Sequence, residues 1–251
     1  MNRWSRAARS VVLLGRSDAA GLERRTLLYY SRESPFDQAE YLAQGLQGWE
    51  VEAILNHFPP AGRILVAAAG GGRETLALAA MGYEATAFDP SDHLLDKFRA
   101  LGAAEGRIVR AAPSEVPAFR ERFDGVVIGW GGYTHVPESA RRAAFLRALA
   151  RQMKPGAPLL MSFYLRRADG WRSRTATLAA NAMRRALRLP ASVEAGDSMT
   201  DKFEHRFTEQ EVAGELTAAA LRLLDFKPRP FPHAVARFDD PAARSAPCSL
   251  L

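Results

Sequence analysis

The stretch that decides the fold reads GRILVAAAGGGRETLALAAMGYEATAFDP, residues 62–90. An apolar run at 64–69 meets three glycines at 70–72, a helical pattern follows at 74–81, and a second apolar run ends in an acid, Asp89. This order of strand, glycine-rich turn, helix, strand and carboxylate is typical of the first unit of a parallel sheet that binds a nucleoside-containing ligand. The stretch therefore predicts an α/β protein with a ligand site beside the glycine turn.

An alternation of strands and helices continues beyond this stretch. Ser91 is a candidate N-cap for a helix that ends near residue 101. The later elements are expected as a strand at 107–111, a helical turn at 114–120, a buried strand at 123–130, a loop at 131–137, a helix at 138–152 and a strand at 157–165. Such alternation gives a parallel sheet with helices on both faces.

The N-terminal part departs from this alternation, and we expect residues 1–60 to form a helical cap or lid. Helices are expected at 3–16, at 21–30 and, from a start at Ser34–Pro35 and with interruptions at Gly45 and Gly48, up to residue 58. The region is rich in aromatic residues: Tyr29, Tyr30, Phe36, Tyr41 and Trp49. These side chains either pack the cap onto the sheet or line a substrate pocket.

The C-terminal part is expected to begin with a helical insertion at about 166–205, with its helix at 176–187. The remaining elements are expected as a helix opened by a capping box at Thr208–Glu211, strands at 221–226 and 233–238, and a tail at 241–251. The last two strands would add an antiparallel edge hairpin. The whole pattern predicts a Rossmann-like, doubly wound sheet of seven strands that is otherwise parallel.

The composition limits the class of protein. With 251 residues, 47% hydrophobic and 25% charged, the chain suits one globular α/β domain with an appended cap. A net charge of +6 is compatible with nucleic-acid binding, but only four of the 34 basic residues are lysine and the arginines are dispersed, so we do not expect a nucleic-acid partner. The single cysteine, Cys248, excludes a disulfide framework within one chain. Since no run of eighteen apolar residues predicts a membrane span, a cytoplasmic location is expected.

The glycine turn is compatible with two classes of cofactor. A dinucleotide site requires G-x-G-x-x-G, and in that frame Thr75 stands in place of the third glycine. The alternative pattern, small-x-Gly-x-Gly, fits AAGGG at 68–72. Together with FDP at 88–90 and FDGVVIGW at 123–130, this pattern resembles the class I S-adenosylmethionine-dependent methyltransferases over roughly residues 62–165.

The resemblance implies a methyltransferase domain over 61–240 with S-adenosylmethionine as its cofactor. Asp89 would accept hydrogen bonds from the ribose, Pro90 would lie beside the adenine, and Ser114 or Glu115 would meet the adenine amino group. The implied cofactor-binding residues are Ala68, Gly70, Gly72, Glu74, Asp89, Pro90, Ser114, Glu115, Trp130 and Gly131.

The sequence departs from the family's nucleotide motif at two positions. Val66 occupies the place of the motif's acid, and Ala68 that of its first glycine. In the family, the acid usually anchors the methionine end of the cofactor. Another group, from the N-terminal cap or Glu74, is therefore expected to hold the amino end.

Methyl transfer is an in-line displacement in which the enzyme aligns the nucleophile and sometimes removes a proton. His135 is the best candidate base because an imidazole titrates near neutrality, although it could equally pack against or cap the helix that follows. Tyr133 is the second candidate catalytic residue, and with Trp130 it forms either a pocket wall or part of the core. His233 could also face the site.

Missing motifs narrow the substrate. Neither Asp-Pro-Pro-Tyr nor Asn-Pro-Pro-Tyr follows the strand at 123–130, and no cluster of Asp or Asn there indicates a metal site. A metal-independent enzyme acting on a small molecule, such as a secondary metabolite, is the leading hypothesis. Arg166, Arg167, Arg172 and Arg174 either favour an anionic substrate or form a solvated face.

The alternatives to this leading hypothesis are an RNA or protein methyltransferase, a non-methylating cofactor-binding protein of this fold, and a nicotinamide dehydrogenase. Monomer and homodimer both stay open.

Overall fold

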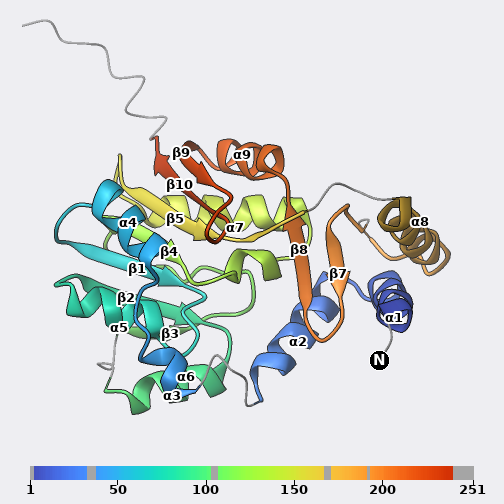
Figure 1. Cartoon of the computed structure of the whole chain (residues 1–251), viewed down its shortest axis with the longest axis horizontal. Coiled ribbons are helices and arrows are strands. Elements are labelled where there is room, and N and C mark those ends of the chain that lie inside the picture. The colour runs from blue at the N-terminus through green and yellow to red at the C-terminus, as the bar shows by residue number, and fades with distance from the viewer. Residues whose placement is uncertain (1–2, 33–37, 103–106, 167–170, 191–192, 240–251) are drawn as a thin grey trace, which may run out of the picture.

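The computed structural model describes residues 3–32, 38–102, 107–166, 171–190 and 193–239. Among these residues, seven strands form one sheet in the order β3-β2-β1-β4-β5-β10-β9 (Figure 1). Its strands are β1 (Arg63–Ala67), β2 (Glu84–Asp89), β3 (Ile108–Arg110), β4 (Gly125–Ile128), β5 (Pro158–Ser162), β9 (Leu221–Lys227) and β10 (His233–Phe238). The first five run parallel and β10 is antiparallel to both of its neighbours, so the predicted fold class is confirmed.

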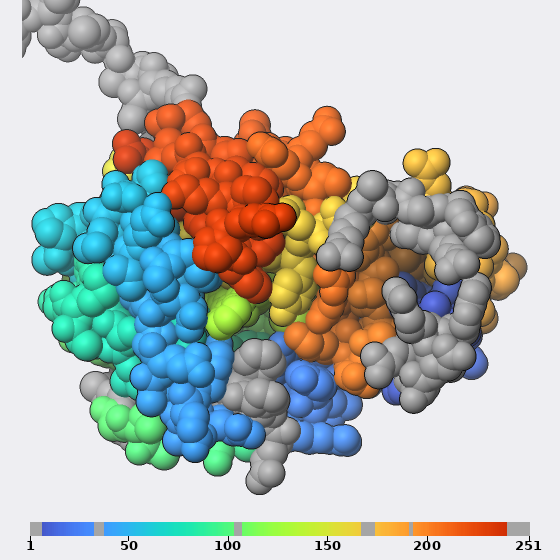
Figure 2. All heavy atoms as spheres, viewed as in Figure 1, coloured from blue at the N-terminus to red at the C-terminus, as the bar shows by residue number. Residues whose placement is uncertain are grey.

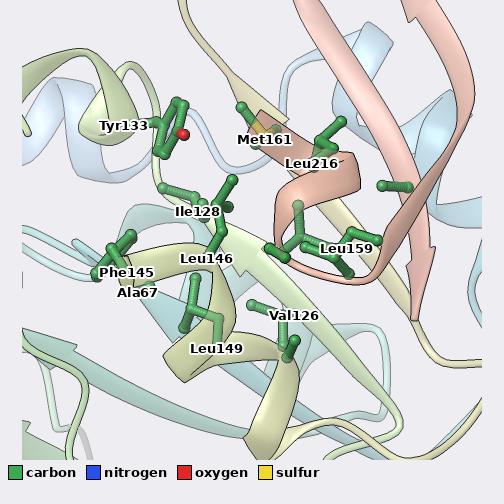
Figure 3. Close-up of a cluster of buried hydrophobic side chains, with 14 of the residues drawn as sticks. Ala67, Val126, Ile128, Tyr133, Phe145, Leu146, Leu149, Leu159, Met161 and Leu216 are labelled. Carbon is green, nitrogen blue, oxygen red and sulfur yellow. The ribbon is translucent and has the colours of Figure 1, made fainter. Parts of the chain in front are cut away.

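Helices cover both faces of this sheet. One face carries α4 (Gly48–His57), α5 (Arg73–Ala80) and α6 (Asp92–Ala100), and the other carries α7 (Ser139–Gln152) and α9 (Glu209–Ala218). Successive residues of β1 show why two cores form, because side chains alternate across a strand. Ile64 and Val66 belong to the cluster under α4–α6, whereas Leu65 and Ala67 belong to the cluster under α7 and α9 (Figure 3).

A second, smaller body of structure stands beside the sheet. It combines α1 (Arg3–Arg16), α2 (Ala19–Tyr30) and α8 (Trp171–Ala186) with a small sheet of β6 (Tyr164–Leu165), β8 (Phe203–Phe207) and β7 (Asp197–Met199). Figure 1 shows α1, α8 and β7 side by side at one end of the molecule, and a separate apolar cluster joins them. The first two helices of the predicted cap, α1 and α2, and the insertion at 166–205, distant in sequence, therefore form one unit, whereas α4 packs on the main sheet.

The structure corrects several local predictions. The insertion is helical only in part, because β7 and β8 pair within it. The strand expected to run to residue 165 leaves the main sheet after Ser162, and its end pairs with β8 as β6. No helical turn forms at 114–120, where Pro117 disfavours helical dihedrals at the residue before it. The break into two helices expected at Gly45 and Gly48 is present, because α3 (Ala39–Leu42) ends before Gly45 and α4 begins at Gly48. The start proposed at Ser34–Pro35 and the tail at 241–251 lie outside the described residues.

Other boundaries follow the predicted signals closely. Ser91 caps α6 by accepting a hydrogen bond from the N–H of Leu94, and Thr208 with Glu211 forms the expected capping box of α9. Within the part of the chain that is described, none of the helices combines the length and apolar character that a membrane span needs.

Candidate functional site

A cavity of about 300 Å³ lies at the carboxyl ends of β1, β2 and β4. Figure 2 shows this face hollowed between the segment of α3 (Ala39–Leu42) and α4, the loop before β10, and β6. The walls come from the glycine turn, from the segment after β2, from residues 112–115, and from Trp130 after β4. The N-terminal cap closes another side with α2 and Tyr41. The cavity is therefore shared between the sheet and the smaller body.

The backbone of the glycine turn explains its composition. Ala68, Gly70 and Gly72 all have positive φ, at 51°, 55° and 93°. At Gly72 a side chain is also excluded sterically, because a Cβ there would lie 2.2 Å from the ring of Phe98. Ala68 holds a left-handed conformation that costs an ordinary residue roughly 1–2 kcal/mol. Ala68 and Gly70 line the cavity, while Gly72 shapes the turn and begins α5 behind it.

Asp89 ends β2 next to this turn. Its buried carboxylate accepts hydrogen bonds from the N–H of Gly70 at 2.9 Å and the N–H of Ser91 at 2.8 Å. Burial raises the pKa of Asp89 to about 6, against the lowering effect of those two donors. Because each carboxylate oxygen has a second lone pair, Asp89 can accept further hydrogen bonds from a ligand in the cavity. Pro90, beside it, also lines the cavity.

A buried ion network closes the end of the cavity nearest α5. Arg73 forms ion pairs with Glu50 of α4 and with Glu74, each at 2.7 Å, and its side chain is only 1% exposed. Glu74 in turn accepts a hydrogen bond from the N–H of Trp130 at 2.9 Å. The guanidinium lies 5.5 Å from the ring centre of Tyr41 and 5.4 Å from that of Trp130. The cap and the sheet thus meet through one arginine held between two carboxylates.

The opposite wall carries Ser114 and Glu115. Ser114 donates a hydrogen bond to Glu23 of α2 at 2.6 Å, and Glu23 also pairs with Arg141 at 2.9 Å. Ser114, Glu115 and Glu23 all line the cavity. This wall therefore offers polar groups from both the sheet and the cap.

A chain of hydrogen bonds crosses the cavity wall at His135. The Nδ1 of His135 lies 2.7 Å from the carbonyl of Phe203, and its Nε2 lies 2.9 Å from the hydroxyl of Tyr30. Lys202 Nζ donates to that hydroxyl at 3.1 Å and lies 3.4 Å from Nε2. Burial, aided by the charge of Lys202, lowers the pKa of His135 to about 3, so the imidazole is neutral at pH 7. His135 lines the cavity, and its low pKa makes it a weak base.

Three predicted site residues do not line the cavity. Tyr133 is fully buried in the core, its hydroxyl donates to Glu215, and Figure 3 shows it among the core side chains rather than at a surface. The structure thus corrects the expectation that it contacts the substrate. Gly131 is buried, with its N–H bonded to Ser162, and Gly72 acts through the shape of the turn.

Histidine and arginine candidates outside this group serve packing or surface roles. His233 is buried with its ring 4.7 Å from that of Trp49 and does not line the cavity. Arg166 pairs with Glu211 at 3.0 Å, and Arg174 is exposed. Arg167 lies outside the described residues, and no placement is given for the side chain of Arg172.

The residues that sequence reasoning missed come from both bodies of structure. Glu23, Lys202 and the Arg73–Glu50 pair carried no motif, since their neighbours in space are far away in the chain. Only the aromatic residues of the cap gave a signal. Of these, Tyr30 and Tyr41 line the cavity, whereas Trp49 packs in the core.

Comparisons with known proteins agree with this geometry. Residues 64–156 match a family described as a methyltransferase domain. No curated protein sequence matches the chain. Among solved structures, a methyltransferase from Methanosarcina mazei is 20% identical with a TM-score of 0.58, over 78% of this chain and 99% of the other.

Two further similar structures have named substrates. An amino pentose methyltransferase from Micromonospora echinaspora, bound to S-adenosylmethionine, is 16% identical over 82% of this chain and 99% of that one, with a TM-score of 0.55. A 1,6-didemethyltoxoflavin N1-methyltransferase from Burkholderia thailandensis, with its substrate and S-adenosylhomocysteine, is 22% identical over 76% of both chains, with a TM-score of 0.53. At these identities the likeness establishes the fold.

Proposed function

We propose that the chain is an S-adenosylmethionine-dependent methyltransferase acting on a small molecule, because residues 64–156 match a methyltransferase domain family and the sheet has the Rossmann-like methyltransferase fold. The observation that carries the proposal is the buried carboxylate of Asp89 facing a left-handed glycine turn in the wall of the cavity. The substrate assignment is supported by the cavity volume of about 300 Å³, which is at the small end for ligand pockets and suits a small acceptor better than a polymer.

The residues present fit this cofactor along its length. Asp89 would accept hydrogen bonds from the two ribose hydroxyls, and the backbone at Gly70 allows the close approach that they need. Pro90, Ser114 and Glu115 would surround the adenine.

The methionine end of the cofactor would lie against the ion network of Arg73, Glu50 and Glu74. This network would supply the charged group that is absent from the motif at Val66. Glu74 has the charge to attract an ammonium group, and Arg73 the charge to attract a carboxylate. Glu50 keeps Arg73 in place from the other side. Since two carboxylates surround one guanidinium, this end of the cavity suits a cofactor whose net charge is positive.

The bound cofactor would supply a methyl carbon activated by a positive sulfur. The chain's own contribution is then to align the acceptor and to exclude water, which suits a cavity with seven aromatic side chains in its wall. We infer that residues 1–60 act as the lid of a catalytic domain spanning about 61–240, because Tyr30 and Tyr41 close the cavity from the N-terminal side.

Isothermal titration calorimetry with S-adenosylmethionine and S-adenosylhomocysteine tests the proposal. We expect saturable binding of both, with a dissociation constant in the micromolar range typical of enzyme ligands. NADH serves as the control and should give no heat of binding. Absence of binding at millimolar S-adenosylmethionine would contradict the proposal.

A further inference from the structure

One wall of the cavity carries four aromatic rings that come from separate segments of the chain. Tyr41 lies in α3, Trp130 follows β4, Tyr164 belongs to β6, and Phe231 lies between β9 and β10. All four side chains line the cavity, and each is only partly buried. Part of each ring is therefore left for a ligand to cover.

The angles between these rings suit a flat ligand. The ring centres of Trp130 and Phe231 lie 4.9 Å apart at 85°, and those of Phe231 and Tyr164 lie 5.9 Å apart at 70°. The ring centres of Tyr41 and Trp130 lie 6.3 Å apart at 31°. Because the walls stand steeply to one another, a flat aromatic ring can stack on one of them while it meets another edge-on, and both kinds of contact stabilise it.

The rings are held in place by contacts within the protein. The ring of Phe231 stacks on that of Trp49 of α4, with centres 5.9 Å apart. The guanidinium of Arg73 lies 5.4 Å from the ring centre of Trp130, and that of Arg206 lies 5.4 Å from the ring centre of Tyr164. A wall that is ordered before the ligand arrives lowers the entropy cost of binding.

Most polar side chains of the cavity already have partners within the protein. This holds for Glu23, Thr26, Arg73, Glu74, Ser91 and Ser114. A polyhydroxylated ring such as a sugar brings several hydroxyl groups, and burying each of them without a partner is unfavourable. The cavity therefore favours a ring with few polar substituents.

Tyr164 supplies a polar contact within the aromatic wall. In the described part of the chain its hydroxyl makes no hydrogen bond, although its backbone N–H donates to Thr134. Burial raises the pKa of Tyr164, so the hydroxyl keeps its proton at neutral pH. It can therefore donate to, or accept from, one group on the edge of a bound ring.

We infer that the acceptor has a flat aromatic or heteroaromatic ring, which lies against Trp130, Phe231 and Tyr164 and forms a hydrogen bond with the hydroxyl of Tyr164. The inference rests on the proposed function and names the substrate class of the same site. Glu74 accepts a hydrogen bond from the N–H of Trp130, so the aromatic wall adjoins the ion network against which the methionine end of the cofactor would lie.

The experiment compares phenol with cyclohexanol, which carry the same hydroxyl group on a flat ring and on a saturated ring. Both are uncharged at pH 7. Their dissociation constants are measured by ligand-observed NMR on the full chain with saturating S-adenosylhomocysteine. We expect phenol to bind about tenfold more tightly, because aromatic contacts add to the effect of the buried area. Methyl β-D-xylopyranoside is the polyhydroxylated probe and should not displace phenol.

Substitutions in the wall test where this preference arises. Phe231→Leu and Tyr164→Leu should each reduce the preference for phenol to about threefold or less. The matched control is Phe119→Leu, which removes a ring that packs on Phe123 outside the cavity and should leave the preference unchanged. Tyr164→Phe keeps the ring and loses one hydrogen bond, so it should weaken both alcohols alike, about three- to tenfold, and keep the preference between them.

Four results would overturn the inference. They are no binding of phenol, equal affinity for phenol and cyclohexanol, tighter binding of the xyloside than of phenol, and a preference for phenol that survives both leucine substitutions in the wall. Calorimetry with S-adenosylhomocysteine on the same samples separates the two levels. A chain that binds S-adenosylhomocysteine but gives one of these results disproves the acceptor class alone, whereas a chain that binds neither S-adenosylhomocysteine nor S-adenosylmethionine contradicts the proposed function.

Discussion

The two halves of the cavity are built in different ways. The cofactor half is made from residues that directly follow or end neighbouring strands of one sheet, with the turn at 68–72, Asp89 and Trp130 placed by the parallel strands β1, β2 and β4. The acceptor half is made from residues far apart in the chain: Tyr30 and His135 are separated by 105 positions, and Tyr30 and Lys202 by 172. The difference teaches that the ligand common to a family can be encoded locally, whereas the acceptor is selected by how the cap and the insertion meet.

Breaking the ion network of Arg73, Glu50 and Glu74, which joins the cap to the sheet, should have the largest effect on stability. Arg73→Ala leaves Glu50 and Glu74 buried without their cation, and breaking a buried ion pair in this way costs about 3–5 kcal/mol. We expect the free energy of unfolding, measured by urea denaturation, to fall by that amount. The control is Arg110→Ala, which removes an exposed pair with Asp92 and should cost no more than about 1 kcal/mol. Equal losses in the two variants would show that the network does not join the cap to the sheet.

The glycine turn should be the next most sensitive feature. Gly72→Ala combines a left-handed backbone with a Cβ placed 2.2 Å from the ring of Phe98, and we expect a loss of roughly 2–4 kcal/mol in unfolding free energy. Gly82→Ala is the matched control, because its φ is 95° but nothing lies within 4 Å of the added Cβ. That variant should lose only the backbone part, about 1 kcal/mol. A similar loss in both variants would mean that Phe98 moves aside and that the turn is not sterically fixed.

Asp89→Asn and Tyr30→Phe should show that the two halves of the cavity have different functions. Loss of a charged acceptor for the ribose should weaken S-adenosylmethionine binding by about 1–3 kcal/mol, roughly tenfold or more, in a calorimetric titration. Tyr30→Phe, at the acceptor end, should leave that affinity within about threefold while slowing turnover. If Tyr30→Phe weakened cofactor binding as much as Asp89→Asn, the division into halves would be wrong.

The same carboxylate predicts a pH dependence. The pKa of Asp89 is raised to about 6 in the folded protein, so the group gains a proton as the pH falls through 6 and loses its charge. Cofactor affinity should therefore be highest above pH 6 and fall by about tenfold at pH 5. The stability of the fold depends on pH in the opposite direction. Between the pKa of 3.8 in the unfolded chain and the pKa of about 6 in the folded protein, the folded state binds more protons than the unfolded state. The contribution of Asp89 to stability therefore declines as the pH rises through this range. The affinity of Asp89→Asn should be flat over this range.

Ala68→Gly should give the smallest effect, and in the opposite direction. Relief of the left-handed conformation at Ala68 should raise the unfolding free energy by about 0.5–1 kcal/mol, after the greater flexibility of glycine in the unfolded chain is counted. Thermal and urea denaturation both measure this gain. A loss of stability would indicate that the contact of the Ala68 methyl group beside Gly132 outweighs the strain.

Most of the main sheet could be predicted from the sequence, because its signals are local. The apolar runs of β1, β2 and β4, the glycines of the turn and the N-caps at Ser91 and Thr208 each act within a few residues. The predictions failed where contacts between residues distant in the sequence determine the local structure. β8 pairs with both β7 and β6 instead of continuing a helical insertion, and Tyr133 has an acidic partner 82 positions away that holds it in the core.

Three features followed from the sequence alone: the α/β class, the antiparallel hairpin at the edge of the sheet, and the glycine turn that faces a nucleoside-like ligand. They could be predicted because the period of the side chains and the backbone dihedrals are properties of short segments. Only the tertiary structure showed which ionic groups lie near the turn that lacks the motif acid and which distant residues line the rest of the cavity. Arg73 finds Glu50, and His135 finds Tyr30 and Lys202, through packing of the cap and insertion against the sheet. Such partners leave no pattern in the sequence, since folding alone brings their elements together.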